Sequence, residues 1–230
     1  MNPFMMLAAV AADWPRLGPL LDPYAHPALR TLLAELRTGL RTHDRGRPAE
    51  GEPAEADRRA ADRAVRAVLD ALPDHEAARL RGDGGTERFA GTSPSAVHEG
   101  FDVMDLCMLV IDGNPMVGPL LGPVRERLLR APASSPRETG PTDPRLIVLT
   151  RENGERQLPA FQFEAGAMPW EVVLEVADVL RADRDPWGAA DWWLSANAWT
   201  GTPPAGLLGQ SRDPELLGAA RALTVAGGEW

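Results

Sequence analysis

Apolar residues in the first 130 positions recur at helical spacing, in stretches that polar, Gly-rich or Pro-rich segments separate. The clearest stretch covers residues 26–43. Within it, apolar residues follow helical spacing and lie on one face of a helix: Leu29, Leu32, Leu33, Leu36 and Leu40. This front region is therefore predicted to be all-α. Further helices are predicted over residues 3–12, 54–72, 74–81, 95–111 and 115–130.

The hydrophobic pattern changes after residue 145. The apolar run 146–150 predicts a strand, Asn153-Gly154 predicts a hairpin turn, and residues 157–163 predict the returning strand. A lone hairpin is only marginally stable in water, so helices have to cover it. The predicted fold class is mostly α with a small β-hairpin, in which an all-α region precedes an α+β module. The helices of that module are predicted over residues 169–180, 186–198, 204–208 and 213–224.

The stretch between these two parts has the composition of a linker. Residues 131–145 contain four prolines and many small residues, with little to bury. We therefore expect a helical region of unassigned role over residues 1–130, a Pro-rich linker over 131–145, and a C-terminal module over 146–230.

Tryptophan is concentrated in that module, which holds six of the seven tryptophans of the chain. Tryptophan is costly to expose and is enriched where proteins bind one another. On a helix through residue 199, Trp192 and Trp199 lie seven positions apart on one row, and Trp193 points away from both. Either most of these rings fill the core of the module, or at least one face, with Trp192 or Trp199, is an interface for a second copy or a partner. Trp230, behind two glycines, either anchors in a partner or packs on its own domain.

Composition excludes several classes of function. The net charge is −9 and neither half is basic, so non-specific binding to nucleic acid is not expected. The chain contains no lysine, which excludes P-loop, kinase and Schiff-base chemistry that depends on a lysine amine. The single cysteine, Cys107, rules out an intrachain disulfide and is predicted to be a buried core thiol.

Targeting signals are not predicted. The apolar stretch 1–12 has no Lys or Arg before Arg16, so it does not resemble a secretory signal. No stretch approaches the roughly 20 apolar residues that a membrane span needs. We expect a soluble, cytoplasmic protein that does not associate with membranes.

The order of motifs in the C-terminal module resembles a known family. The pattern comprises Pro159-Ala160-Phe161-Gln162-Phe163 in a strand, Trp187 with Trp192-Trp193-Leu194 in a helix, and Gly201-Thr202-Pro203-Pro204 followed by Leu207-Leu208. It is similar to the toxin-binding domain of Xre/MbcA/ParS-type antitoxins, over about residues 146–225.

That resemblance implies a non-enzymatic protein that neutralises a cognate toxin, often a RES-domain enzyme that degrades NAD. It also implies dimerisation and often a preceding helix-turn-helix that binds DNA. Here residues 101–110 are apolar where DNA-contacting side chains are wanted, so DNA binding is doubtful. The residues predicted to bind the partner are Trp192, Trp199, Leu207, Leu208 and Trp230.

Two other functions are considered. A self-associating structural or adaptor protein could use the same module. A small enzyme could use His98, Asp102 and Asp105, which share one face of the predicted helix 95–111, although acids near a helix N-terminus explain them more simply. No metal-ligand spacing, nucleophile elbow or dinucleotide loop is found, so no catalytic residue, metal or cofactor is expected.

Overall fold

The computed structural model describes residues 2–44, 54–82, 100–135, 143–164 and 168–227. The chain divides into two compact units, Met1–Gly122 and Pro123–Trp230. Helices dominate both, and the second unit carries a small antiparallel sheet, which confirms the predicted fold class.

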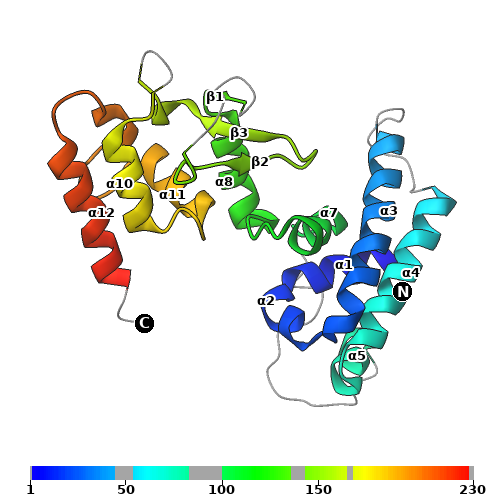
Figure 1. Cartoon of the computed structure of the whole chain (residues 1–230). Coiled ribbons are helices and arrows are strands. Elements are labelled where there is room, and N and C mark those ends of the chain that lie inside the picture. The colour runs from blue at the N-terminus through cyan, green and yellow to red at the C-terminus, as the bar shows by residue number, and fades with distance from the viewer. Residues whose placement is uncertain (1, 45–53, 83–99, 136–142, 165–167, 228–230) are drawn as a thin grey trace. The chain divides into compact units, whose positions relative to one another are not determined.

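In the described residues of the first unit, the regular elements are all helices or helical turns (Figure 1). Its α-helices are α1 (Pro3–Ala12), α2 (Trp14–Leu17), α3 (His26–Asp44), α4 (Glu55–Ala71), α5 (Asp74–Arg81) and α7 (Val103–Cys107). Two short 3₁₀ turns, Gly18–Leu20 and Pro23–Ala25, join α2 to α3, and a π-helical turn, Met108–Asp112, follows α7.

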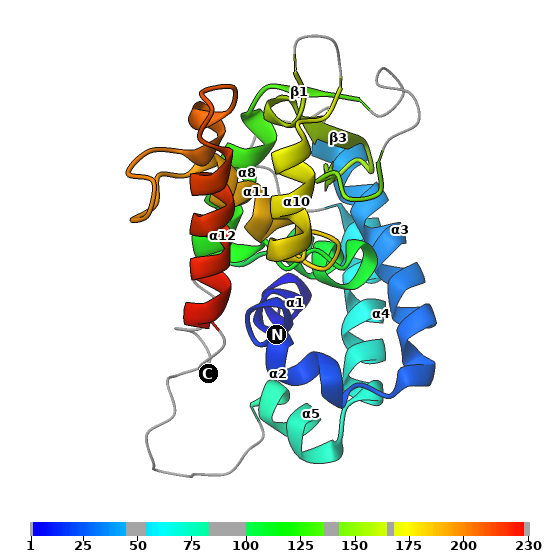
Figure 2. The same ribbon diagram turned by 60° about the vertical axis from the view of Figure 1, so that its left-hand side comes forward.

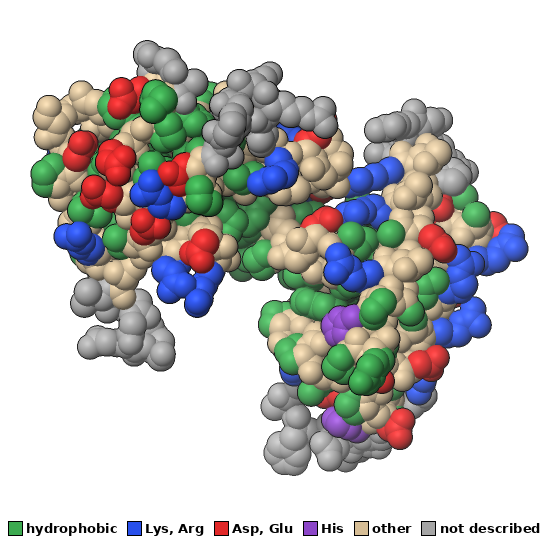
Figure 3. Space-filling view, viewed as in Figure 1, with side chains coloured by type: hydrophobic (Ala, Val, Ile, Leu, Met, Phe, Trp, Pro, Cys, Tyr) green, Lys and Arg blue, Asp and Glu red, His purple; other side chains and the backbone are tan. Residues whose placement is uncertain are grey.

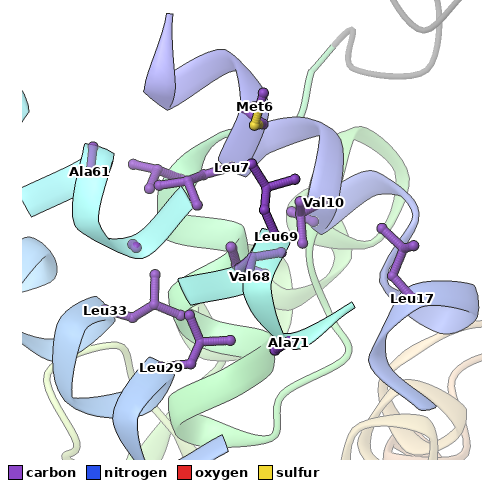
Figure 4. Close-up of a cluster of buried hydrophobic side chains, with 14 of the residues drawn as sticks. Met6, Leu7, Val10, Leu17, Leu29, Leu33, Ala61, Val68, Leu69 and Ala71 are labelled. Atoms are coloured by element: carbon purple, nitrogen blue, oxygen red, sulfur yellow. The ribbon is translucent and has the colours of Figure 1, made fainter. Parts of the chain in front are cut away.

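The core of this unit lies where α1 crosses α4 and α7 and where α3 packs along α4 (Figure 4). Leu29, Leu33 and Leu36 are buried on α3, as their spacing predicts. Facing them, the small buried residues Ala61 and Ala64 allow α4 to approach closely. The apolar face of each helix is therefore matched by that of its neighbour.

The predicted helix over residues 95–111 is confirmed from Val103 onward, where α7 and the π-helical turn run to Asp112, but residues 100–102 are not helical. Gly100 has φ 89°, and the extended residue Asp102 caps the helix. The Asp102 carboxylate accepts the backbone N–H of Met104 and Asp105, and the Asp105 carboxylate accepts the N–H of Asp102 at 3.0 Å. This reciprocal capping box fixes the start of α7 at Val103, later than the hydrophobic spacing suggested.

Cys107 is buried, as predicted, with its Sγ 3.6 Å from the carbonyl oxygen of Leu33. Burial disfavours the thiolate and raises the pKa of Cys107 to about 12. The thiol is therefore a small core group and not a nucleophile at neutral pH.

Helix α8 (Gly118–Arg130) begins in the first unit and continues into the second. The remaining elements of the second unit are β1 (Ala133–Ser134), β2 (Leu149–Thr150), β3 (Arg156–Pro159), α10 (Glu171–Leu180), α11 (Pro186–Leu194) and α12 (Asp213–Gly227), with 3₁₀ turns at Ala160–Gln162 and Pro204–Leu207.

The predicted hairpin is confirmed: β2 and β3 pair antiparallel, with Leu149 opposite Gln157. Its strands are shorter than the predicted 146–150 and 157–163, since β2 begins at Leu149 and the chain turns into a 3₁₀ helix after Pro159. In the turn, the Gly154 N–H donates to the Arg151 carbonyl at 2.9 Å, and the Arg151 N–H donates to Glu155 at 2.8 Å. Gly154 has φ 83°, which a residue with a side chain rarely adopts. Glycine at the end of this turn therefore lets the strand reverse and pair.

The sheet has a third strand that the sequence pattern did not predict. In β1, Ala133 lies opposite Pro159 and Ser134 opposite Leu158, which gives the strand order β1-β3-β2. The first residues of the predicted linker 131–145 thus belong to the sheet, and the second unit begins earlier, at Pro123. Residues 136–142 of that linker lie outside the described residues. Strands pair through their backbone N–H and C=O groups, and the proline content that indicated a linker gives no information on this pairing.

The fully buried side chain of Gln162 links the end of β3 to the segment that precedes β2. Its Oε1 accepts the Ile147 N–H at 2.7 Å, and its Nε2 donates to the carbonyls of Ile147 at 3.0 Å and Pro159 at 3.2 Å. The amide therefore satisfies backbone groups that the short strands leave unpaired.

Helix α10 covers this region with its apolar face and also packs against α12, which lies beside it in both views (Figures 1 and 2). Leu174 joins Leu146 and Leu158 in one cluster, and Val173 and Val176 are fully buried. The predicted covering of the hairpin by helices is confirmed.

We predict that Gln162→Leu lowers the free energy of unfolding of the second unit by at least about 2 kcal/mol, because it leaves three buried backbone groups without a partner. Urea unfolding followed by tryptophan fluorescence reports on this unit, which holds six of the seven tryptophans. Gln210→Leu is the control: Gln210 is exposed and bonds only the Gly206 carbonyl, so a change below about 0.5 kcal/mol is expected. Equal losses in both variants would contradict the role of Gln162.

The pKa of Cys107 predicts a pH dependence of stability. The folded-state pKa is raised from an ordinary value of 9.0 to about 12, so above pH 9 the unfolded thiol loses its proton while the folded one keeps it. The free energy of unfolding therefore falls between pH 9 and 12. Urea midpoints from circular dichroism at pH 8 and 10.5, in reducing buffer, are expected to drop more in the wild type than in Cys107→Ala. Parallel drops would count against the shift.

Candidate protein-interaction surface

Helix α11 begins at a well-defined cap. Asp185 precedes Pro186, and its carboxylate accepts the Gly188 N–H at 2.8 Å. The predicted helix to residue 198 is too long, since α11 ends at Leu194 and Ser195 is extended. Trp192 and Trp199 therefore do not share one helix row.

Arg127 of α8 holds this helix end. Its guanidinium donates to the Leu194 carbonyl at 3.4 Å and to the Ser195 hydroxyl at 3.0 Å, and it forms an ion pair with Asp191. The Ser195 hydroxyl in turn donates to Asp191 at 2.8 Å. A cation at a helix C-terminus satisfies carbonyls that have no partner within the helix and favours its end at this point.

The tryptophans before that end lie in the core. Trp193 is fully buried; its ring centroid lies 5.3 Å from that of Phe161 and 5.0 Å from that of Trp192, which it meets edge-on. Trp187 and Trp192 are also buried, and Trp192 is 7% exposed. The structure thus places Trp192, a predicted partner-binding residue, among the core residues.

Trp199 lies after the helix end and is 46% exposed. It belongs to residues 195–203, which we call the tryptophan loop. The Asn197 Oδ1 accepts the N–H of Trp199 at 3.1 Å and of Thr200 at 3.0 Å, and the Asn197 carbonyl accepts the N–H of Gly201 at 2.8 Å. The indole is therefore displayed on a loop with its own hydrogen bonds.

The other residues predicted to bind a partner differ in their exposure. Leu207 ends the turn Pro204–Leu207 and is buried, whereas Leu208 is half-buried beside it. Trp230 lies outside the described residues. Of the five predicted partner-binding residues, Trp199 and Leu208 thus reach the surface of the described structure.

One sequence signal for this surface was missed. No charged residue occurs from Trp192 to Ser211, in a chain that is 25% charged. Within that stretch Ala198, Trp199 and Pro203 are exposed. A neutral, partly apolar surface loses little hydration energy when a partner covers it, so this segment is suited to docking.

A second surface feature is acidic. Glu171, Glu175 and Asp178 recur on the exposed side of α10, opposite its buried valines, and Figure 3 shows acidic side chains gathered over α10 and α12. Arg145 lies beside this ridge, with its Nη1 3.9 Å from the Asp178 carboxylate. Such a ridge attracts basic partners over distance.

The helix face considered above as a candidate enzyme site holds Asp102 and Asp105, and both have a structural role. Asp102 and Asp105 cap α7, and the Asp105 Oδ1 also accepts the Gly118 N–H at 3.1 Å. His98 lies outside the described residues. Among the described residues no group of three or more His, Cys, Asp or Glu side chains could hold a metal ion. None of the helices in the described part of the chain combines the length and hydrophobicity that a bilayer crossing requires.

Comparisons of the chain with protein-family models, with curated proteins and with solved structures found no match. The resemblance to antitoxins stays a prediction from the residue pattern of the C-terminal module.

The turn that carries Leu208 depends on the next residue. Gly209 has φ 73°, and a Cβ there lies only 3.2 Å from the Trp170 ring. We predict that Gly209→Ala destabilises the second unit by about 1–2 kcal/mol in urea unfolding, from backbone strain and this contact. Gly206→Ala is the matched control, because a Cβ at Gly206 meets no atom within 4 Å. A similar loss in both variants would show that the constraint is not specific to Gly209.

Proposed function

We propose that this chain is a non-enzymatic, protein-binding protein of antitoxin type, whose C-terminal module docks on a cognate toxin through the tryptophan loop. The observation that carries the proposal is Trp199, a half-exposed indole fixed on an ordered, charge-free loop. Exposed tryptophans are among the residues that contribute most to protein–protein affinity when a partner pocket buries them.

The order of the tryptophan loop favours docking, in addition to its exposed apolar area. A loop ordered before binding loses little conformational freedom on docking, so more of the interaction energy is retained as affinity. Half-buried Leu208 extends the apolar contact. The charges lie outside the loop, which keeps unpaired ions out of the contact region.

The acidic ridge of α10 supports a basic partner. The module from residue 146 onward holds 12 acids and 6 arginines, a balance of −6. Attraction between this surface and a basic cleft of the toxin speeds the encounter and makes the association rate sensitive to salt.

The residue pattern shared with Xre/MbcA/ParS-type antitoxins suggests the class of partner, a RES-domain enzyme that degrades NAD. In this proposal the chain acts in the cytoplasm, self-associates, and blocks the toxin active site. DNA binding does not form part of it, because residues 101–110 carry no Arg, Lys, Asn or Gln, and Val103, Leu106 and Cys107 of α7 pack in the core of the first unit.

We predict that Trp199→Ala weakens the complex with the protein encoded next to this gene by about 30-fold, equivalent to about 2 kcal/mol. The neighbour is expressed alone, where it is expected to arrest growth and deplete NAD, and with the chain, where growth is expected to recover. Binding is measured by calorimetry. Tyr24→Ala is the control, because Tyr24 is 92% exposed in the first unit and its removal should leave affinity unchanged.

Two outcomes would refute the proposal. One is a neighbouring protein that neither arrests growth nor binds the chain. The other is a complex whose affinity is equal for the wild type and Trp199→Ala. A large homo-assembly without a second protein would instead favour the structural or adaptor function.

A further inference from the structure

We infer that Asn197 is the positioning residue of the interaction surface: its side-chain oxygen holds the tryptophan loop in the form that presents Trp199 to the partner. This inference rests on the proposed function. It adds a residue that the sequence pattern did not single out and that does not itself need to touch the partner.

The hydrogen bonds of Asn197 converge on Trp199 and its neighbour. Three donors lie within bonding distance of the single Oδ1 atom: the N–H of Trp199 at 3.1 Å, the N–H of Thr200 at 3.0 Å, and the Thr200 hydroxyl at 3.0 Å. The hydroxyl also lies 2.6 Å from the Thr202 carbonyl. One oxygen thus fixes the backbone on both sides of the Trp199 Cα and so sets the direction in which the Trp199 side chain leaves the loop.

Both ends of the loop are anchored separately. Before Asn197, the Arg127 contacts fix Leu194 and Ser195. After it, Gly201 adopts φ 67° and donates to the Asn197 carbonyl at 2.8 Å. Since these anchors do not involve the Asn197 side chain, removing its oxygen should loosen the middle of the loop and leave α11 in place.

The two halves of the Asn197 amide behave differently. The Oδ1 is used fully, whereas the Nδ2 is buried and has no hydrogen-bond acceptor among the described residues. The acceptor is therefore the functional half of the amide. Aspartate keeps that acceptor and should rescue the loop, while leucine has nearly the same shape and lacks it.

The first experiment uses the free full-length chain. Amide exchange of Trp199 and Thr200, followed by ¹⁵N NMR, is expected to be at least about fivefold faster in Asn197→Leu and close to wild type in Asn197→Asp. Amides of α11 serve as the internal control for folding. Unchanged exchange in Asn197→Leu would overturn the inference, whatever the partner turns out to be.

The second experiment measures affinity for the neighbouring gene product with Asn197→Leu, Trp199→Ala and the double variant. If Asn197 acts through Trp199, Asn197→Leu weakens binding about five- to tenfold in the wild-type background and has no further effect in the Trp199→Ala background. Additive losses would overturn the positioning role. Faster exchange in Asn197→Leu, combined with full affinity in Trp199→Ala, would reject the proposed function and also the link between Asn197 and binding.

Discussion

The end of α11 at Leu194 is the constraint on which the interaction surface depends. Arg127 supplies donors to the last carbonyl and an ion pair to Asp191, and the chain leaves the helix at Ser195. If the helix continued to residue 199, Trp199 would lie on the same helix row as the buried Trp192. Because it ends, Trp192 and Trp193 lie in the core and Trp199 reaches the surface.

The same physical theme recurs elsewhere: polar side chains satisfy backbone groups at points where regular structure is interrupted. Gln162 pairs with Ile147 beside short strands, and Asp102 and Asp105 cap α7. Asn197 has the equivalent role in the tryptophan loop. Residues that suggest chemistry in a sequence are therefore structural here, because a buried or terminal backbone group without a partner is costly.

Hydrophobic periodicity predicted α1, α3, α4 and α5 nearly to the residue, and the Asn-Gly pair predicted the hairpin. These features are local, since each follows from neighbours within a few positions. The strand β1, the start of α7 and the end of α11 were not predicted. Each involves a polar or backbone contact that competes with the hydrophobic pattern, and β1 and the end of α11 need a partner far away in the chain.

By itself, the sequence determined a mostly helical protein with a C-terminal α+β module, a buried core cysteine and a tryptophan-rich C-terminal segment. Only the tertiary structure decided which tryptophan is available to a partner. In the sequence, Trp192, Trp193 and Trp199 belong to the same uncharged, tryptophan-rich segment, so composition does not distinguish them. Burial depends on where a helix stops and what packs across it, and Arg127, 64 positions before Asp191, fixes that point through space.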